Sequence, residues 1–341
     1  MSTLVGARRR ALFRDATAAR ANTAVLLWTA AGWLASFALM GSDSVLLDIA
    51  GVVLCVHTMV LAAYLVHEAA HHTLFAVHRA NEWAGEVVSF IAGSSYASFA
   101  RIRHMHIRHH LDRADLTCFD FKGLLKRRPR LRRLLEALEW AYVPATEILM
   151  HLQVVWRPFF VRSQRRYLPR AASMLLLRGL LLVAIALWSL KALLLYVLAL
   201  ALQLHVLNFF DAFHHTFDQF FVAPDEPVPM QGRDRAYEYA NTFTNLIASR
   251  YIGLNLLTLN FGYHNAHHVR PADPWYRLPA LHRKLYGEDA SQVLSLGALL
   301  GTWHRNRVRR VAGEHYGAAG NGSIDVRDFV GAHGVSFLTV V

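Results

Sequence analysis

Four long stretches of the chain carry almost only apolar residues, and they come in two closely spaced pairs. The first pair is residues 21–40 and 45–66, and the second pair is residues 171–190 and 192–210. Each stretch has about 20 residues, which at about 1.5 Å per residue of α-helix is enough to cross a bilayer core of about 30 Å. A four-residue turn separates the first pair, and Lys191 separates the second. The pattern therefore predicts an all-α integral membrane protein with four transmembrane helices in two hairpins.

The basic segments between and before these stretches predict how the helices are oriented. Five arginines precede the first stretch, and the middle segment 68–169 is also basic, whereas the hairpin connections hold only Lys191. Because positively charged loops stay in the cytoplasm, we expect both termini and the middle segment on the cytoplasmic side, with the middle segment forming a helical cap. Within it, the interrupted apolar stretches 83–100 and 134–160 are typical of interfacial or re-entrant helices.

Composition agrees with a membrane protein and excludes several other classes. The 341 residues are 54% hydrophobic and 18% charged, whereas a soluble domain has about 25% charged residues. So much apolar surface demands burial, which excludes intrinsic disorder. The net charge of +12 could indicate a nucleic-acid partner, but the long uncharged apolar runs argue against one. We interpret the basic runs 126–133 and 162–170 as faces toward water or lipid headgroups, with a dock for a donor protein as the alternative.

The remaining segments add no chemistry of their own. Cys55 and Cys118 are the only cysteines, which excludes a disulfide framework and a four-cysteine metal site. A signal peptide would also begin with a basic segment, but no small-residue cleavage site follows and a second apolar stretch comes at once. We treat residues 1–316 as a single domain. The glycine-rich tail, residues 317–341, has no predicted role.

Histidine is the unusual residue, because 20 are present and more than half stand in short clusters. The three clusters are His67, His71 and His72; His104, His106, His109 and His110; and His264, His267 and His268. Residues at positions i, i+3 and i+4 share one face of a helix, so three rings from a single turn can converge on one point. Two copies of H-x-x-H-H would arise by chance only roughly 0.002 times in this chain. The clusters therefore indicate a shared function.

A shared function for so many imidazoles is metal binding. Neutral imidazole is a good ligand for Fe, Zn and Cu and a poor one for Mg or Ca. Eight imidazoles exceed what one ion accepts, so we expect two ions, on the cytoplasmic side that all three clusters share. His214 and His215 end the fourth stretch on that side, with Asp211 four residues before His215, and supply a further ligand or a partner that holds one. The solitary histidines are expected to be hydrogen-bonded core residues: His57, His78, His151 and His205.

The order and spacing of the clusters resemble those of the membrane-bound fatty-acid desaturase superfamily. H-x₃-H, H-x₂-H-H and H-x₂-H-H follow one another around two transmembrane hairpins. The stretch 263–282, with Y-R-L-P-A-L at 276–281, is similar to the third histidine box of bacterial and plant acyl desaturases. His215-Thr216 is similar to the extra His-Thr that often ends the fourth span in that family. The resemblance covers roughly residues 60–285.

The resemblance implies a centre of two Fe ions held almost wholly by histidine, with O₂ as co-substrate. The histidines that match the family's ligands are His67, His71, His106, His109, His110, His264, His267 and His268, with His215 as the extra ligand and His214 as its competitor. Neighbours expected to support the ligands are His72, His104, Asp211 and His214. Because no His-Pro-Gly-Gly haem motif is present, two electrons are expected from a separate ferredoxin or cytochrome-type donor.

The reaction implied is the oxidation of an unactivated C–H bond in a lipid acyl chain. Such a methylene has no acidic proton that a side chain could remove, so the cofactor must carry the chemistry and no catalytic residue is assigned. Desaturation to a cis double bond is the expected outcome, and a hydroxylase, an acetylenase or a carotenoid ketolase or hydroxylase is an alternative on the same scaffold. The motif departs from the family at His72, at Asn265-Ala266 and at Val269-Arg270-Pro271, which leaves substrate and position of oxidation open.

Two other classes compete with this interpretation. The segment 67–71 satisfies H-E-x-x-H, the motif of zinc proteases, with Glu68 as the base. That reading leaves the second and third clusters unexplained. A histidine-rich metal transporter would need ionisable residues within its spans, which here hold few beyond Asp48, His57, Arg178 and His205.

Overall fold

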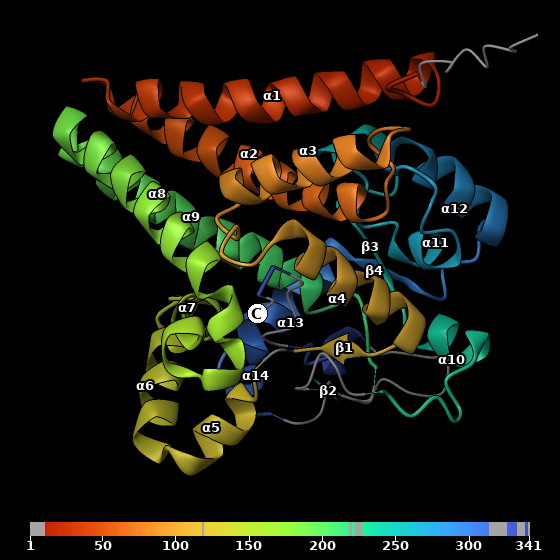
Figure 1. Cartoon of the computed structure of the whole chain (residues 1–341). Helices are drawn as coiled ribbons and strands as arrows, with labels where there is room; N and C mark the ends of the chain where they lie inside the picture. Colours follow the sequence, from red (N-terminus) through yellow and green to blue (C-terminus); the bar gives the residue numbers. More distant parts are fainter. Residues whose placement is uncertain are drawn as a thin grey trace, which may run out of the picture.

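The computed structural model describes residues 11–117, 119–217, 220–221, 227–313, 326–332 and 338–339. Within these residues nearly all regular structure is helical, with two small sheets. The long helices form the upper and left part of the molecule, and shorter elements lie below and to the right of them (Figure 1). The ends of the second and fourth long helices carry His67, His71 and His215 of the candidate site, and two shorter helices carry its other histidines.

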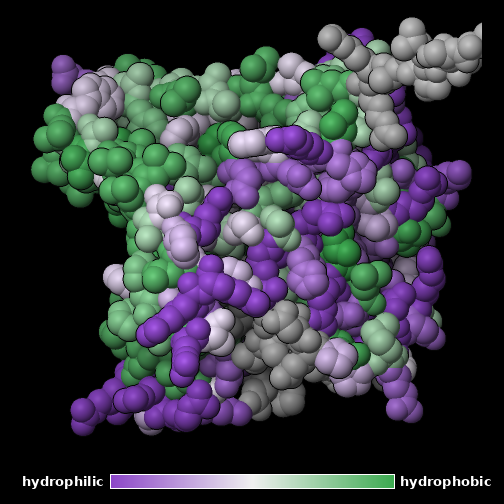
Figure 2. Space-filling view, in the orientation of Figure 1, coloured by the Kyte–Doolittle hydropathy of each residue, from purple (hydrophilic) through white to green (hydrophobic). Residues whose placement is uncertain are grey.

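Four helices of the described residues are long and apolar enough to cross a membrane, which confirms the predicted fold class. They are α1 (Ala16–Met40), α2 (Val45–Ala70), α8 (Leu168–Trp188), which follows the 3₁₀ helix η1 (Arg162–Tyr167), and α9 (Leu190–Asp211). Large apolar side chains lie exposed on all four, among them Leu34, Val53, Leu187 and Leu198. In the view of Figure 2 the apolar surface gathers at the upper left, over these helices.

The two helical pairs meet at the tips of their turns. Lys191 lies in the first turn of α9 rather than in the connection, which is Ser189 alone. Its Nζ lies 2.8 Å from Asp48 Oδ2 in the first turn of α2, and it also donates to Ser42 O. The ion pair therefore joins the two turns at the end of the bundle that lies farthest from the histidine clusters.

The segment between the pairs folds into α3 (His78–Ile91), α4 (Phe99–Asp112), α5 (Phe121–Arg127), α6 (Pro129–Trp140) and α7 (Ala145–Phe160). Each of the two apolar stretches predicted here is broken in the middle. The stretch 83–100 breaks at 92–98 between α3 and α4, and 134–160 breaks at 141–144 between α6 and α7. Ser98 caps α4 by accepting a hydrogen bond from Arg101 N, which fixes where the helix of the second cluster begins.

The chain after α9 is built of short elements. The helical ones are α10 (Arg235–Ala240), η2 (Ile252–Thr258), α11 (His264–Val269), η3 (Trp275–Arg277), α12 (Leu278–Tyr286), α13 (Leu296–Asn306), α14 (Arg309–Ala312) and η4 (Val326–Asp328). Strand β1 (Asp115–Leu116) pairs in parallel with β2 (Phe220–Phe221), and β3 (Thr244–Leu246) pairs in parallel with β4 (Val293–Ser295). The first sheet ties the end of α4 to the segment after α9, so it brings the second cluster beside His214 and His215.

Part of the C-terminal tail packs against the end of α9. Phe329 lies 5.2 Å from the Phe213 ring, and Ala332 N donates to Ala212 O at 2.8 Å. Gly331 adopts φ +84, and a Cβ there would lie 2.9 Å from Phe213, so the close approach requires glycine. The sequence assigned the tail no role, and its described residues 326–332 support the segment that carries His214 and His215.

Candidate metal centre

Nine histidines from separate parts of the chain meet in two groups at the inner ends of α2 and α9. The five-histidine group is His67, His71, His106, His110 and His267, and the four-histidine group is His109, His215, His264 and His268. Within each group the candidate ligand atoms all lie within 4.8 Å of one another. The three clusters predicted from sequence therefore come together, and His215 rather than His214 joins them.

The second and third clusters each divide their rings between the two groups. On α4, His106 and His110 join the five-histidine group while His109 joins the other. On α11 the pair His264 and His268 joins the four-histidine group, and His267 joins the five-histidine group. Successive helical residues are about 100° apart, so the ring at i+3 diverges from that at i+4. The expectation that three rings of one turn converge on a single point is wrong.

Within each group the Nε2 atoms face one another. His67 and His267 approach to 2.9 Å and His71 and His106 to 2.7 Å in the five-histidine group, while His109 and His215 lie 3.1 Å apart in the other. Two nitrogens bound at about 2.1 Å to adjacent positions of one ion would be about 3 Å apart. Among the described residues, the buried Nε2 of His268 has no hydrogen-bond partner. The donor set and its spacing fit transition-metal ions.

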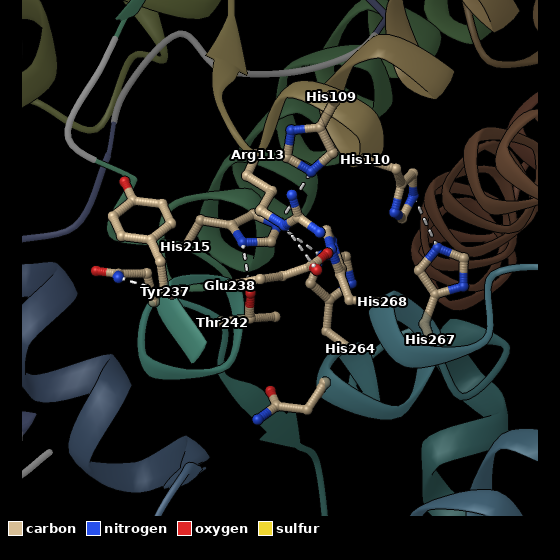
Figure 3. Close-up of polar contacts among 12 residues, drawn as sticks. His109, His110, Arg113, His215, Tyr237, Glu238, Thr242, His264, His267 and His268 are labelled. Carbon is tan, nitrogen blue, oxygen red and sulfur yellow. Dashed lines mark hydrogen bonds and ion pairs between the residues drawn. The ribbon is translucent and has the colours of Figure 1, made fainter. Parts of the chain in front are cut away.

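Several rings are held from behind at their Nδ1 atoms. His109 Nδ1 lies 2.9 Å from Ala114 O, and His268 Nδ1 lies 3.0 Å from Glu238 Oε1. On His215, Nδ1 lies 3.3 Å from Thr242 Oγ1. A partner at one ring nitrogen fixes the tautomer and directs the other nitrogen toward a metal. Figure 3 shows the contacts of His268 with Glu238 and of His215 with Thr242.

Burial keeps these imidazoles neutral. It lowers the pKa of His109 to about 4 and that of His268 to about 3. Burial, followed by repulsion from neighbouring imidazoles, also holds the pKa of His110 and of His264 well below the usual value. Because a protonated imidazole cannot ligate a metal, the fold presents these rings in the form that can.

A small chamber of about 50 Å³ lies against both groups. Ligand-group rings in its wall are His106, His109, His215 and His264, and the other lining residues are Met105, Asp115, Leu116, Asp211, His214 and Phe261. His214 stacks on His264 with ring centroids 4.1 Å apart. The chamber is large enough for one or a few small molecules. Asp211 and His214, predicted as neighbours of the ligands, both line it.

Other predicted histidines lie away from the two groups. His72 packs its ring on His78, with centroids 4.2 Å apart, and its φ of 56° turns the chain away after α2. His104 is exposed on α4. Of the solitary histidines, His57 accepts a hydrogen bond from Trp28, and the rings of His151 and His205 each bond a backbone oxygen.

Three carboxylates at the site, and the hydroxyl of Thr242 that supports His215, had no clear signal in the sequence. Glu238 lies on α10 and Asp115 on β1, outside any motif, and burial raises the pKa of Asp115 to about 7. Glu68 was visible only as the base of a protease motif. Its Oε2 instead accepts hydrogen bonds from Thr73 Oγ1 at 2.5 Å and Trp275 N at 3.1 Å. Glu68 therefore ties α2 to the segment after the third cluster.

The fold and the two groups define an all-α membrane protein with a polyhistidine site that is compatible with metal binding. The family model described as fatty acid desaturase matches residues 44–299, which is three quarters of the chain. The chain therefore belongs to the fatty acid desaturase family. A search of curated proteins gives no match. Family membership and the histidine groups together fit a membrane-associated, desaturase-like oxidase with a lipid substrate.

Proposed function

We propose that this protein uses O₂ and two iron ions to oxidise an unactivated C–H bond in a lipid acyl chain, with desaturation to a cis double bond as the outcome. The observation that carries the proposal is the meeting of nine neutral imidazoles in two groups around one chamber. Two groups match two ions, and each imidazole set suits iron. When bound, the irons would activate O₂ for the attack on a C–H bond, which no side chain of the chain can carry out.

Each group of histidines would hold one ion. The five-histidine group places its rings on three elements, and the four-histidine group places His109 and His215 opposite the α11 pair. Rings held through Nδ1, such as His109 and His268, keep Nε2 directed inward without rearrangement. The protein thus supplies a preorganised ligand shell whose members come from both hairpins and the cap.

The chamber supports the same proposal from the substrate side. Met105, Leu116 and Phe261 give it an apolar wall beside the ligand rings. Such a wall excludes water and suits a methylene group. Among the described residues that line the chamber, none is a serine or cysteine that could act as a nucleophile without a metal. A zinc-protease reading explains only His67 and His71, whereas the arrangement uses all three clusters.

The remaining expectations belong to this proposal. The termini and both histidine groups lie on the cytoplasmic side, since the basic segments flank them. A separate ferredoxin or cytochrome-type protein delivers the two electrons. The basic runs 126–133 and 162–170 face water or lipid headgroups. The alternative is that they form the docking site for the electron donor.

Expression of the full chain in a bacterial host tests the proposal. Lipid extracts should contain acyl chains that lack two hydrogen atoms relative to those of the host, as measured by mass spectrometry. The His109→Ala variant should insert normally and give no such product. The His151→Ala variant, altered outside the groups, should keep it. Extracts that match those of cells without the protein, despite a metal-loaded chain, would refute the proposal.

A further inference from the structure

A second and much larger cavity lies where two of the spans meet the short elements that follow α9. It is an open groove of about 930 Å³ between α2, α9, η2 and α13. Its size is that of a binding site for a sizeable organic molecule. Among the described residues that line it none is charged, and most are aliphatic or aromatic. We call it the lateral groove.

The mouth of the lateral groove faces the surface that the bilayer would cover. Val53 on α2 is 62% exposed and Leu257 on η2 is 48% exposed, and both line the groove. The apolar surface of the spans thus continues into the groove without a polar rim at these positions. Lipid chains, which surround the spans, are the molecules that meet this opening.

The few polar side chains of the lateral groove make hydrogen bonds within the protein, although the buried Nε2 of His57 has no hydrogen-bond partner among the described residues. His57 accepts a hydrogen bond from Trp28 Nε1 at 3.4 Å. The His205 ring bonds Tyr142 O at 2.6 Å, and Thr258 donates to Asn255 O. With no charge and few polar groups in the described lining, the groove suits a bare hydrocarbon chain rather than a headgroup.

A single layer of aromatic rings separates the lateral groove from the chamber. Phe210 lines the groove and stacks on His214, which lines the chamber, with ring centroids 6.3 Å apart. Tyr64, one turn beyond the groove residue Val60, stacks on Phe261 at 4.4 Å. The other side of that ring layer touches both histidine groups, because the ring centroid of Phe261 lies 4.9 Å from that of His67 and 5.1 Å from that of His264.

We propose that the lateral groove holds the hydrocarbon chain of a bilayer lipid, and that this chain reaches the chamber sideways from the membrane past Phe261. The substrate is then a lipid resident in the bilayer rather than a water-soluble acyl thioester that arrives from the cap. The catalytic part of this inference rests on the proposed function, whereas occupancy of the groove by lipid does not.

A second apolar groove provides a matched control. It has a volume of about 400 Å³ and lies between α1, α3 and α8. Leu34 lines it and is 63% exposed, so it meets lipid as Val53 does. Its described lining includes the ion pair of Arg170 and Glu86 but no residue of the histidine groups or of the aromatic layer. A lipid held there would have no path to the chamber.

Photolabelling tests the occupancy. The full chain is reconstituted in phosphatidylethanolamine and phosphatidylglycerol vesicles that carry a trace of phospholipid with a diazirine at the end of one acyl chain. After irradiation, labelled peptides should concentrate on α2 and α9 around Val56 and Leu202. Val56→Trp and Val53→Trp fill the groove from two positions and should each reduce that labelling about fivefold or more, while Leu34→Trp should not. Labelling spread evenly over the exposed faces of the spans, and unchanged in both filled variants, would overturn the proposal.

Product analysis tests the route in the same preparations once they are supplied with O₂ and a reduced ferredoxin or cytochrome-type donor. Both filled variants should oxidise the vesicle lipid about tenfold or more slowly than the parent chain, with unchanged metal content, whereas Leu34→Trp should retain its rate. Lipid oxidation at the parent rate in variants that have lost the labelling would overturn the lateral route. If no preparation oxidises lipid but the groove is still labelled, the proposed function falls and the occupancy stands.

Discussion

Glu238 holds the ring of His268 from behind. His268 Nδ1 donates to Glu238 Oε1 at 3.0 Å, and Arg113 Nε lies 3.0 Å from the other carboxylate oxygen (Figure 3). Burial alone would raise the pKa of Glu238, but the hydrogen bond from His268 and the charge of Arg113 hold it below its ordinary value. The carboxylate therefore stays ionised and keeps the proton of His268 on Nδ1. That leaves Nε2 free to bind a metal.

Loss of Glu238 should weaken metal binding at the four-histidine group. We expect Glu238→Ala to lower metal affinity there about ten- to hundredfold, because partners of this kind contribute that much to ligand orientation. Competition with a graded series of chelators, followed by elemental analysis, measures the effect. Glu288→Ala is the matched control, because that side chain is exposed after α12. Equal metal retention in the two variants would show that Glu238 does not position the ligand.

The stability of the metal-free protein should depend on pH in one direction. The folded-state pKa values of His109, about 4, and His268, about 3, lie below the value of about 6.5 for an exposed histidine. Between those values the unfolded chain binds more protons, so the folded state loses stability as the pH falls. The unfolding temperature of the chelator-treated protein should be level above about pH 7 and fall below about pH 6.5. An unfolding temperature that rises on acidification would contradict the buried, neutral state of these rings.

The tail should stabilise the segment that carries His215. Phe329 is 1% exposed and packs on Phe213 and Phe243. Its truncation in Phe329→Ala should cost about 3–5 kcal/mol through lost burial and a cavity. Thermal unfolding should show this as a lowered transition, together with reduced metal retention at the four-histidine group. Asp328→Ala, at the neighbouring exposed position, serves as the control, and an equal effect of both variants would contradict a packing role.

The turns joined by Lys191 and Asp48 should face away from the cytoplasm. Ser44→Cys, exposed at the start of α2, should react with a membrane-impermeant maleimide added to intact cells. Arg128→Cys, exposed between α5 and α6, should react only after lysis. The parent chain gives the background from its own cysteines. Labelling with the opposite pattern would reverse the orientation predicted from the basic segments.

Much of the fold follows from the apolar pattern, because apolar stretches of about 20 residues are long enough to cross a bilayer as helices. The second helix nevertheless runs to Ala70, beyond the predicted end at residue 66. His67 and Glu68 are polar, so hydropathy ends the span before them. The structure buries both, His67 against His267 and Glu68 against Thr73 and Trp275. Tertiary contacts of that kind are not visible in a local pattern.

The clusters could be found from sequence, but their pairing could not. Spacing places His264, His267 and His268 on one helical turn, and only the position of α4 against α11 decides which ring joins which group. Glu238 and Thr242 lie in a segment of short elements with no periodic signal. They reach the site because the chain folds back over the end of α9. The distinction between His214 and His215 likewise depends on which ring faces His109.

Metal content measures the central claim most directly. The full chain, purified without added chelator, should contain two iron atoms per molecule by elemental analysis. His109→Ala and His267→Ala, one from each group, should each lose iron while the protein still inserts in the membrane, and His104→Ala should keep both atoms. A single zinc per chain, or iron that survives both ligand replacements, would contradict the account.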